Sequence, residues 1–196
     1  IDSDGDKDIV TGNGNWINAN NIFFNDGKGR FSPSTQKIGG PTDYKPKLAD
    51  LDKDGDLDVY FVNGWKIPGG VFLNDGKGYF TEKFDTILIP GNKWGAALFD
   101  SDKDGDTDLV EVGYIQDETG YHLNLTQKVY KNDVTARFTL TQDLMNYAGW
   151  PNIAAADVDK DGDMDFVSGV GVHKNDGKGY FTHYGGGSTY FEAPLG

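Results

Sequence analysis

Residues 50–58 read Asp-Leu-Asp-Lys-Asp-Gly-Asp-Leu-Asp, and closely similar stretches occupy residues 100–108 and 157–165. A fourth copy, Asp-Ser-Asp-Gly-Asp-Lys-Asp at residues 2–8, lacks the first of the nine positions. The central aspartates of the four copies are separated by 50, 50 and 57 residues. A pattern that returns at such spacing is typical of repeat architectures, so the repeat decides the fold class.

A second signature follows each of these Asp-rich loops. It reads Asn-Asp-Gly-Lys-Gly-Arg/Tyr-Phe at residues 25–31, 74–80 and 175–181, while the copy at residues 132–138 has lost both glycines. Asn-Asp-Gly between strand-like runs is a strong signal for a hairpin. The segment from this Asn to the next Asp-rich loop has an almost constant length, whereas the segment before it varies. Such a pattern indicates a rigid scaffold that carries one exchangeable loop.

Each repeat contains four strand-like runs, which in the second copy lie at residues 47–49, 57–62, 70–73 and 79–81. Four short antiparallel strands in about 50 residues are typical of a propeller blade. We therefore expect a single all-β domain, a β-propeller of four-stranded antiparallel blades. The expected repeats are residues 1–46, 47–95, 96–152 and 153–196.

The number of blades in the complete ring stays open. The chain begins inside an Asp-rich loop, so the first blade is expected to lack its first strand. The stretch Ser-Thr-Tyr-Phe-Glu-Ala at residues 188–193 could supply that strand and close a small four-bladed propeller. Alternatively, the four blades belong to a larger propeller.

The negative charge of the chain is concentrated in the Asp-rich loops. The net charge is -13, and the loops hold 19 of the 31 acidic residues, four in the first copy and five in each of the others. This distribution favours cation binding and argues against a nucleic-acid partner, which requires a basic surface. No apolar run approaches the ~18 residues that cross a bilayer, so we expect no membrane insertion. The chain contains no cysteine.

Alternating carboxylates supply the six to eight hard oxygen ligands that Ca²⁺ prefers. Side chains at positions 1, 3, 5 and 9 of each loop are expected to converge on one ion, glycine at position 6 makes the turn, and position 7 offers its carbonyl. The expected ligands of the three complete sites are Asp50, Asp52, Asp54, Asp56, Asp58, Asp100, Asp102, Asp104, Asp106, Asp108, Asp157, Asp159, Asp161, Asp163 and Asp165. The first copy retains Asp2, Asp4, Asp6 and Asp8, and its site is expected to be weaker.

A helix-loop-helix calcium site is the obvious alternative for these loops. That motif requires an acidic residue at position 12, which only Glu111 provides, since Phe61 and Ser168 occupy the position elsewhere. The residues that flank the loop at 96–99 and 109–112 alternate as strands do. We therefore expect strands on both sides of each loop.

The paired signatures resemble the FG-GAP or VCBS repeat family, found in integrin α-subunit propellers and in several lectins and bacterial adhesins. The resemblance extends over nearly the whole chain. It implies a propeller fold and a module that recognises a glycan or an extracellular protein. Calcium sites of extracellular modules bind at about 10⁻⁴ to 10⁻³ M, so we expect an extracellular, secreted or cell-surface protein with structural calcium.

Aromatic residues gather on the loops expected at the end of each blade opposite the calcium sites. Such a surface suits the apolar faces of sugars. The candidate ligand-binding residues are Trp16, Trp65, Tyr44, Trp94, Trp150 and Tyr114. Trp94 and Trp150 recur at one repeat position, which favours packing between blades for these two.

The three histidines pair with no recognisable nucleophile and show no metal-binding spacing. We therefore expect a recognition module and not an enzyme, with carbohydrate binding preferred. Protein-protein adhesion of the integrin type is the alternative, as is a non-catalytic propeller scaffold within a polysaccharide-active enzyme.

Overall fold

The computed structural model describes residues 1–13, 20–40, 43–64, 69–84, 92–116, 122–145 and 152–185. These residues form an all-β structure without a helix, and hence without a helix that could span a membrane. The strands are β1 (Ile9–Thr11), β2 (Asn21–Asn25), β3 (Phe31–Pro33), β4 (Asp43–Ala49), β5 (Asp58–Asn63), β6 (Gly70–Asn74), β7 (Phe80–Lys83), β8 (Asn92–Phe99), β9 (Asp108–Gln116), β10 (His122–Asn132), β11 (Phe138–Met145), β12 (Ile153–Ala156), β13 (Asp165–Ser168), β14 (Gly171–Asn175) and β15 (Phe181–Tyr184).

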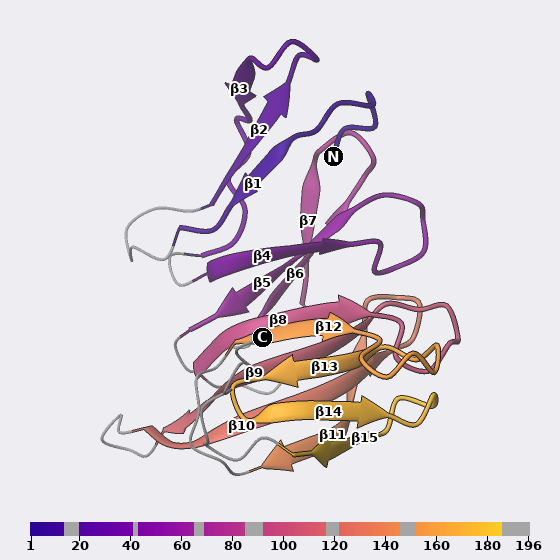
Figure 1. The fold of residues 1–196 in the computed structure, drawn as a ribbon. Coiled ribbons are helices and arrows are strands. Elements are labelled where there is room, and N and C mark those ends of the chain that lie inside the picture. The colour runs from indigo at the N-terminus through magenta and orange to yellow at the C-terminus, as the bar shows by residue number, and fades with distance from the viewer. Residues whose placement is uncertain are drawn as a thin grey trace, which may run out of the picture.

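The strands form four antiparallel sheets, each an up-and-down meander (Figure 1). Their strand orders are β1-β2-β3, β4-β5-β6-β7, β8-β9-β10-β11 and β12-β13-β14-β15, which we call blades 1 to 4. The four strands predicted in the second repeat correspond to β4, β5, β6 and β7. Blade 1 has three strands among the described residues, as expected, while the stretch 188–193 lies outside them.

The Asp-rich loops connect strands and not helices. Residues 96–99 and 109–112 lie in β8 and β9, which pair along their length on either side of the third loop. The rejection of a helix-loop-helix site is therefore confirmed. Strands β4 and β8 begin several residues earlier than predicted, at Asp43 and Asn92.

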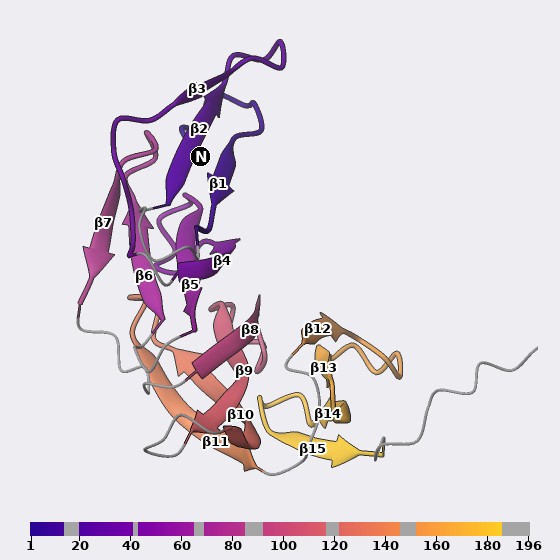
Figure 2. The same cartoon turned by 90° about the vertical axis from the view of Figure 1, so that its left-hand side faces the viewer.

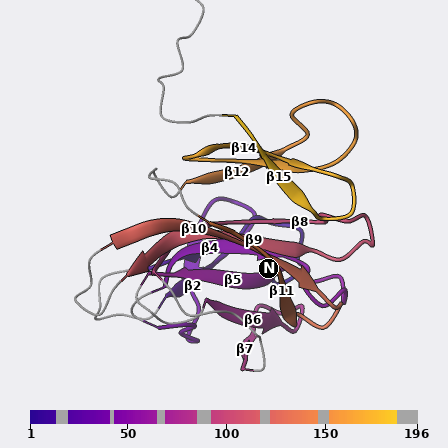
Figure 3. The same ribbon diagram turned by 90° about the horizontal axis from the view of Figure 1, so that it is seen from below.

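The blades pack face to face (Figure 3). An apolar cluster lies between each pair of neighbouring blades. In β5, Val59 and Phe61 pack toward blade 1, whereas Tyr60 and Val62 pack toward blade 3. All six residues of β5 are buried because both faces of blade 2 are covered. A strand that is covered on both faces reads as a continuous apolar run, which explains the sequence of β5.

The described residues form an open array of blades and not a closed ring. Contacts join β1 to β4, β4 and β5 to β8, and β8 to β12. Blade 1 and blade 4 lie at opposite ends of this array (Figure 2). Each of these two blades therefore has one face that no other described blade covers.

Candidate metal centres and ligand face

The Asp-rich loops adopt the same backbone conformation in all four copies. The residue at position 4 has a positive φ in each loop, between 59° and 64°, although it is serine or lysine. The glycine at position 6 has φ between 86° and 95°, a region that side chains rarely adopt. This pair of left-handed residues folds the loop back on itself and turns alternate carboxylates inward.

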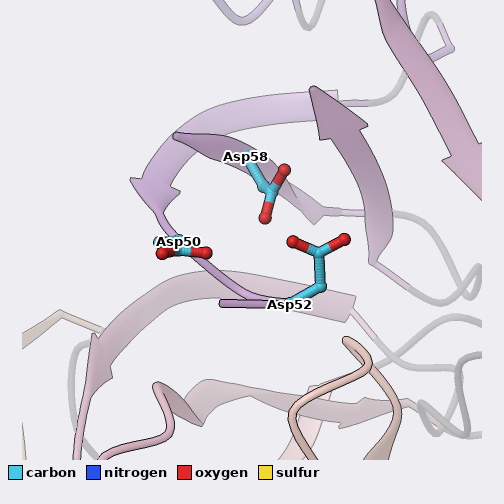
Figure 4. Close-up of side chains that lie close together, drawn as sticks. All are labelled: Asp50, Asp52 and Asp58. Atoms are coloured by element: carbon cyan, nitrogen blue, oxygen red, sulfur yellow. The ribbon is translucent and has the colours of Figure 1, made fainter. Parts of the chain in front are cut away.

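Three carboxylates converge in each complete loop, from positions 1, 3 and 9. Figure 4 shows this arrangement for Asp50, Asp52 and Asp58, whose carboxylates face a common centre. The ligand oxygens in each group lie within 4.8 Å of one another. The three groups are Asp50, Asp52 and Asp58; Asp100, Asp102 and Asp108; and Asp157, Asp159 and Asp165. Carboxylates this close repel one another unless a cation lies between them.

The carboxylate at position 1 uses one oxygen to hold the loop and leaves the other for a ligand. The N–H of Gly55 donates to Asp50 Oδ2 at 3.1 Å, and the equivalent bond from Gly105 to Asp100 is 3.0 Å. Asp50 Oδ1, Asp52 Oδ1 and Asp100 Oδ1 are buried without a hydrogen-bond partner. Buried oxygens of this kind are normally satisfied, so their geometry fits a metal ion.

The carboxylate at position 9 ties the loop to the rest of the blade. Asp58 accepts the N–H of Leu51 and the N–H of Asn74, each at 2.8 Å. The other two complete loops repeat both bonds. Burial raises the pKa of the Asp58 carboxyl to about 6, and the neighbouring carboxylates Asp52 and Asp54 act in the same direction against the two backbone hydrogen bonds. A bound cation would remove this penalty.

The three clusters differ in the residue that precedes the turn asparagine. In blade 3, Lys131 forms an ion pair with Asp102, and in blade 4, Lys174 pairs with Asp159 at 3.1 Å. Blade 2 has Leu73 at the same position. The three clusters therefore share their carboxylates but not their nearby cationic charge.

The pKa values at position 3 follow this difference. Burial and the adjacent Asp54 raise the pKa of Asp52. Burial also opposes ionisation of Asp102, but Lys131 outweighs it and lowers the pKa of that carboxyl. Lys174 lowers the pKa of Asp159. The cluster of blade 2 thus holds the least compensated negative charge.

Positions 5 and 7 lie outside the three-carboxylate groups. Asp54, Asp104 and Asp161 each accept the N–H of the position 7 residue, at 2.8 to 2.9 Å. The side chains of Asp106 and Asp163 pair with Lys53 and Lys103. Coordination by the position 5 side chains and by the position 7 carbonyls of Asp56, Asp106 and Asp163 stays a prediction.

In the first copy, the position 9 carboxylate has the same backbone partner as in the other blades. Asp8 accepts the N–H of Asn25 at 2.8 Å, and its second oxygen accepts a hydrogen bond from the Ile1 nitrogen at 3.0 Å, as the position 9 carboxylates do from position 2 in the other loops. The N–H of Asp6 donates to Asp4 at 2.9 Å. The weaker site expected at Asp2, Asp4, Asp6 and Asp8 stays a prediction.

On the predicted ligand face, Trp94 protrudes from the first strand of blade 3. The pairing of β8 with β9 shifts register between Lys93 and Gly95, and Trp94 stands at this bulge with 45% of its surface exposed. The expectation that Trp94 packs between blades is therefore wrong, because the bulge changes the direction of the Trp94 side chain and leaves it partly in solvent. Asn92 pairs with the half-buried Tyr114 of β9, so Tyr114 lies at the same end of blade 3.

Blade 2 has a register shift at the corresponding place. It lies between Asp43 and Lys45 of β4, which puts Tyr44 at the position that Trp94 occupies in blade 3. The Lys45 ammonium donates to the Trp94 carbonyl at 2.8 Å and links the two strands. Trp16, Trp65 and Trp150 lie outside the described residues, so their role in ligand binding stays a prediction.

A buried ionic cluster between blades 2 and 3 was not predicted. Lys93 and Glu111 form an ion pair at 2.5 Å with side chains that are each 1% exposed, and Tyr60 donates to the other oxygen of Glu111. Glu111 stands where blade 2 has the apolar Phe61. That acidic residue in an apolar strand position is the sequence signal for a buried partner.

Known proteins match this arrangement at the level of family and fold. The FG-GAP-like repeat family matches residues 1–61 and 50–111. No curated protein matches the chain. Among solved structures, a lectin from Agrocybe aegerita that recognises non-reducing terminal N-acetylglucosamine has a similar fold, with a TM-score of 0.59 and 24% sequence identity. The match covers 91% of this chain and 48% of the lectin, so the chain spans about half the length of that protein.

Proposed function

Because this chain belongs to the FG-GAP-like repeat family, we propose that it is a calcium-stabilised, carbohydrate-binding module that works outside the cell. The observation that carries the proposal is the cluster of three carboxylates that repeats in three blades, with buried, unsatisfied oxygens in blades 2 and 3. An all-oxygen site rich in carboxylates suits Ca²⁺ better than Mg²⁺, which demands a strict octahedron and keeps most of its water.

Calcium in these loops would act on the fold and not on a substrate. Each cluster joins the first two strands of a blade, and its position 9 carboxylate also holds the third strand through the turn asparagine. Sites of this kind in extracellular modules fill only at the calcium concentrations found outside cells. For this reason we propose that the protein works outside the cell.

The end of the blades opposite the calcium loops is the ligand face that we propose. Trp94 offers an exposed indole there, and the half-buried Tyr114 lies at the same end of blade 3. Exposed indole rings stack on the apolar faces of sugars. The fold likeness to a lectin for terminal N-acetylglucosamine supports a terminal sugar as the first ligand class to test. We propose binding without catalysis.

A glycan array at millimolar calcium tests the ligand class. We expect Trp94→Ala to lose most of the signal for the bound glycan while its thermal melt stays close to that of the parent, because the side chain is half exposed. Tyr180→Ala is the matched control, since Tyr180 is 59% exposed but lies beside the hairpin turn on the calcium side. A blank array together with capture of an extracellular protein would favour adhesion. Equal loss in both variants would contradict the proposed face.

A further inference from the structure

The turn asparagine of a blade joins its own Asp-rich loop to the loop of the preceding blade. Its backbone N–H donates to the position 9 carboxylate of its own loop. Its side-chain N–H donates to the carbonyl at position 2 of the preceding loop. These bonds run from Asn74 to Ile1 at 2.8 Å, from Asn132 to Leu51 at 2.7 Å, and from Asn175 to Ser101 at 2.7 Å. Neighbouring loops are therefore linked in the same way along the array.

The side chain of this asparagine is buried, and its hydrogen-bonding capacity is used. Asn132 and Asn175 are each 6% exposed. The Asn175 amide group also donates to the carbonyl of Met164 in its own loop, at 3.0 Å. Its oxygen accepts the N–H groups of Gly177 and Gly179, at 3.2 and 3.1 Å. A buried amide with four hydrogen bonds keeps one orientation, because a rotated amide would leave polar groups unpaired.

The residue at position 2 lies between two of the candidate calcium ligands. Leu51 follows Asp50 and precedes Asp52, and it is fully buried. Its N–H donates to Asp58 of its own cluster at 2.8 Å, and its carbonyl accepts from Asn132 of blade 3. The backbone between the two ligands is thus held by its own cluster on one side and by the next blade on the other. A change in the spacing of the carboxylates would displace this contact.

The hydrogen bonds form a continuous line through the three complete clusters. Each cluster is joined to the next by three bonds, with lengths between 2.7 and 3.0 Å. The members of the line, in order, are Asp58, Leu51, Asn132, Asp108, Ser101, Asn175 and Asp165.

Ionic contacts between the loops run beside this line. Lys53 and Lys103 occupy position 4, between the ligand at position 3 and the carboxylate at position 5. Lys53 pairs with Asp106 of the next loop, and Lys103 pairs with Asp163. Asp106 and Asp163 occupy position 7, whose carbonyl is an expected ligand. Both kinds of contact therefore connect the ligand-bearing backbone of one loop to that of the next.

A filled cluster and an empty cluster place different demands on the loop. Three carboxylates within 4.8 Å of one another repel and favour a more open loop, whereas a bound cation holds them together. In the structure the carboxylates converge and the position 2 carbonyl meets the turn asparagine of the next blade at the same time. Filling one cluster therefore orders the backbone that orients this asparagine, and the next ion has less disorder to overcome.

We propose that the three clusters bind calcium cooperatively, and that Asn132 and Asn175 are the positioning residues that couple each cluster to the cluster of the next blade. This inference rests on the calcium role proposed above. Direct repulsion between the bound ions opposes the coupling, but salt screens it, since the Debye length at 0.15 M is about 8 Å. The coupling is reciprocal, so filling either cluster raises the affinity of its neighbour by the same factor.

Calcium titrated into metal-free, ¹⁵N-labelled protein and followed by NMR measures the filling of each cluster separately. The N–H groups of Gly55, Gly105 and Gly162 donate to the position 1 carboxylates, so their resonances report on blades 2, 3 and 4. We expect binding curves with a Hill coefficient above one. Disabling the blade 2 cluster with Asp50→Asn and Asp52→Asn should raise the calcium concentration that half-fills the blade 3 cluster by about fivefold or more.

The disabled cluster has the same net charge as a filled one. Three carboxylates and one Ca²⁺ sum to −1, and Asp58 alone carries −1 after the two Asp→Asn changes. A weaker blade 3 site therefore reflects lost coupling and not lost charge. In an Asn132→Ala background, the same two substitutions should change the blade 3 midpoint by about twofold or less, and this double-mutant cycle isolates the contribution of the asparagine.

Asn25→Ala is the matched control. It removes the side chain of a turn asparagine in blade 1, which lies outside the line that joins the complete clusters, and it should leave the coupling unchanged. Asn175→Ala, with the blade 3 cluster disabled by Asp100→Asn and Asp102→Asn, repeats the test between blades 3 and 4 and serves if Asn132→Ala does not fold.

The possible failures are distinguishable. If calcium fills each cluster independently of its neighbours, the coupling is overturned and the calcium role stands. Coupling that persists at full strength in both asparagine variants overturns the role given to Asn132 and Asn175. Glycine resonances that calcium does not move refute the calcium role itself, and this inference with it.

Discussion

Replacing Lys93 with methionine should destabilise the protein more than a typical single substitution does. The change leaves the Glu111 carboxylate buried between blades 2 and 3 with the Tyr60 hydroxyl as its remaining partner from the cluster. Removing one member of a buried ion pair costs about 3 to 5 kcal/mol, because the other charge stays in a medium of low dielectric. Methionine fills nearly the same volume as the lysine stem, so the cost is electrostatic and not one of packing.

A thermal melt followed by circular dichroism measures this cost. For a chain of this length, 1 kcal/mol corresponds to about 2 to 4 °C, so the expected fall in melting temperature is roughly 6 to 20 °C. Lys128→Met is the matched control. Lys128 pairs with Asp143, which is 36% exposed, and a pair with such access to water contributes at most about 1 kcal/mol.

A combined variant isolates the electrostatic origin of the effect. In Tyr60→Phe, Lys93→Met, Glu111→Leu all three polar groups of the cluster are removed, and most of the lost stability should return, since well-packed apolar residues often replace a buried ion pair without loss. If Lys93→Met melts within a degree or two of the parent, or the triple variant is less stable than Lys93→Met, the reasoning is refuted.

Two further predictions follow from the site and from blade 4. Leu73→Lys should weaken calcium binding at the blade 2 cluster roughly five- to tenfold, and Lys131→Leu should strengthen calcium binding at blade 3. The reason is that one unit charge at contact distance changes the binding free energy by at least ~1 kcal/mol. Calorimetric titration of each variant measures the affinity, and affinities equal to those of the parent would contradict the prediction. Burial, with a smaller contribution from His183, lowers the pKa of His173 to about 4. Between about pH 6.5 and 4, His173 binds a proton in the unfolded chain but stays neutral in the folded chain. The free energy of unfolding should therefore fall as the pH drops through this range. His173→Phe, which places at this position the residue that blade 2 has as Phe72, should make the loss of stability with falling pH smaller. Urea unfolding at several pH values measures it. A pH dependence identical to that of the parent would contradict the role given to His173.

The strands and hairpins could be predicted because their signals are local. The Asp-rich loop marks the start of β5, the Asn-Asp-Gly turn marks the end of β6, and the apolar run after the loop identifies β5 as a strand. The convergence of positions 1, 3 and 9 was also predicted from loop chemistry, but the same reasoning included position 5, whose carboxylate lies outside the three groups because it accepts the N–H of position 7.

Features that depend on pairing between distant residues could not be predicted. The bulge that exposes Trp94 is a property of the register between β8 and β9, which the sequence of β8 does not contain. The hydrogen bond from Tyr60 to Glu111 joins residues 51 positions apart and depends on how two blades pack. Recurrence of an aromatic residue at one repeat position was therefore an unsafe guide to its burial.

The third hairpin turn shows tertiary context overriding local preference. Val134 and Ala136 replace the two glycines of the other turns, which suggests a different turn. Both residues nevertheless have positive φ, 62° and 57°, and preserve the conformation that glycine has elsewhere. Asp133 accepts hydrogen bonds from Thr135, and Ala136 is buried against blade 2, so the surrounding contacts impose the strained backbone.

The central claim is that calcium in the three carboxylate clusters stabilises the blades. Calcium titrated into metal-free protein, with the thermal melt recorded at each concentration, tests it most directly. Binding to the folded state adds RT ln(1 + [L]/Kd), which is about 1 to 3 kcal/mol per site when the free calcium concentration is ten to a hundred times Kd. Three ions per chain would therefore add about 3 to 9 kcal/mol, and the melting temperature should rise by at least about 6 °C. Addition of a chelator should reverse the rise. A melting temperature that calcium and chelator both leave unchanged would contradict the account.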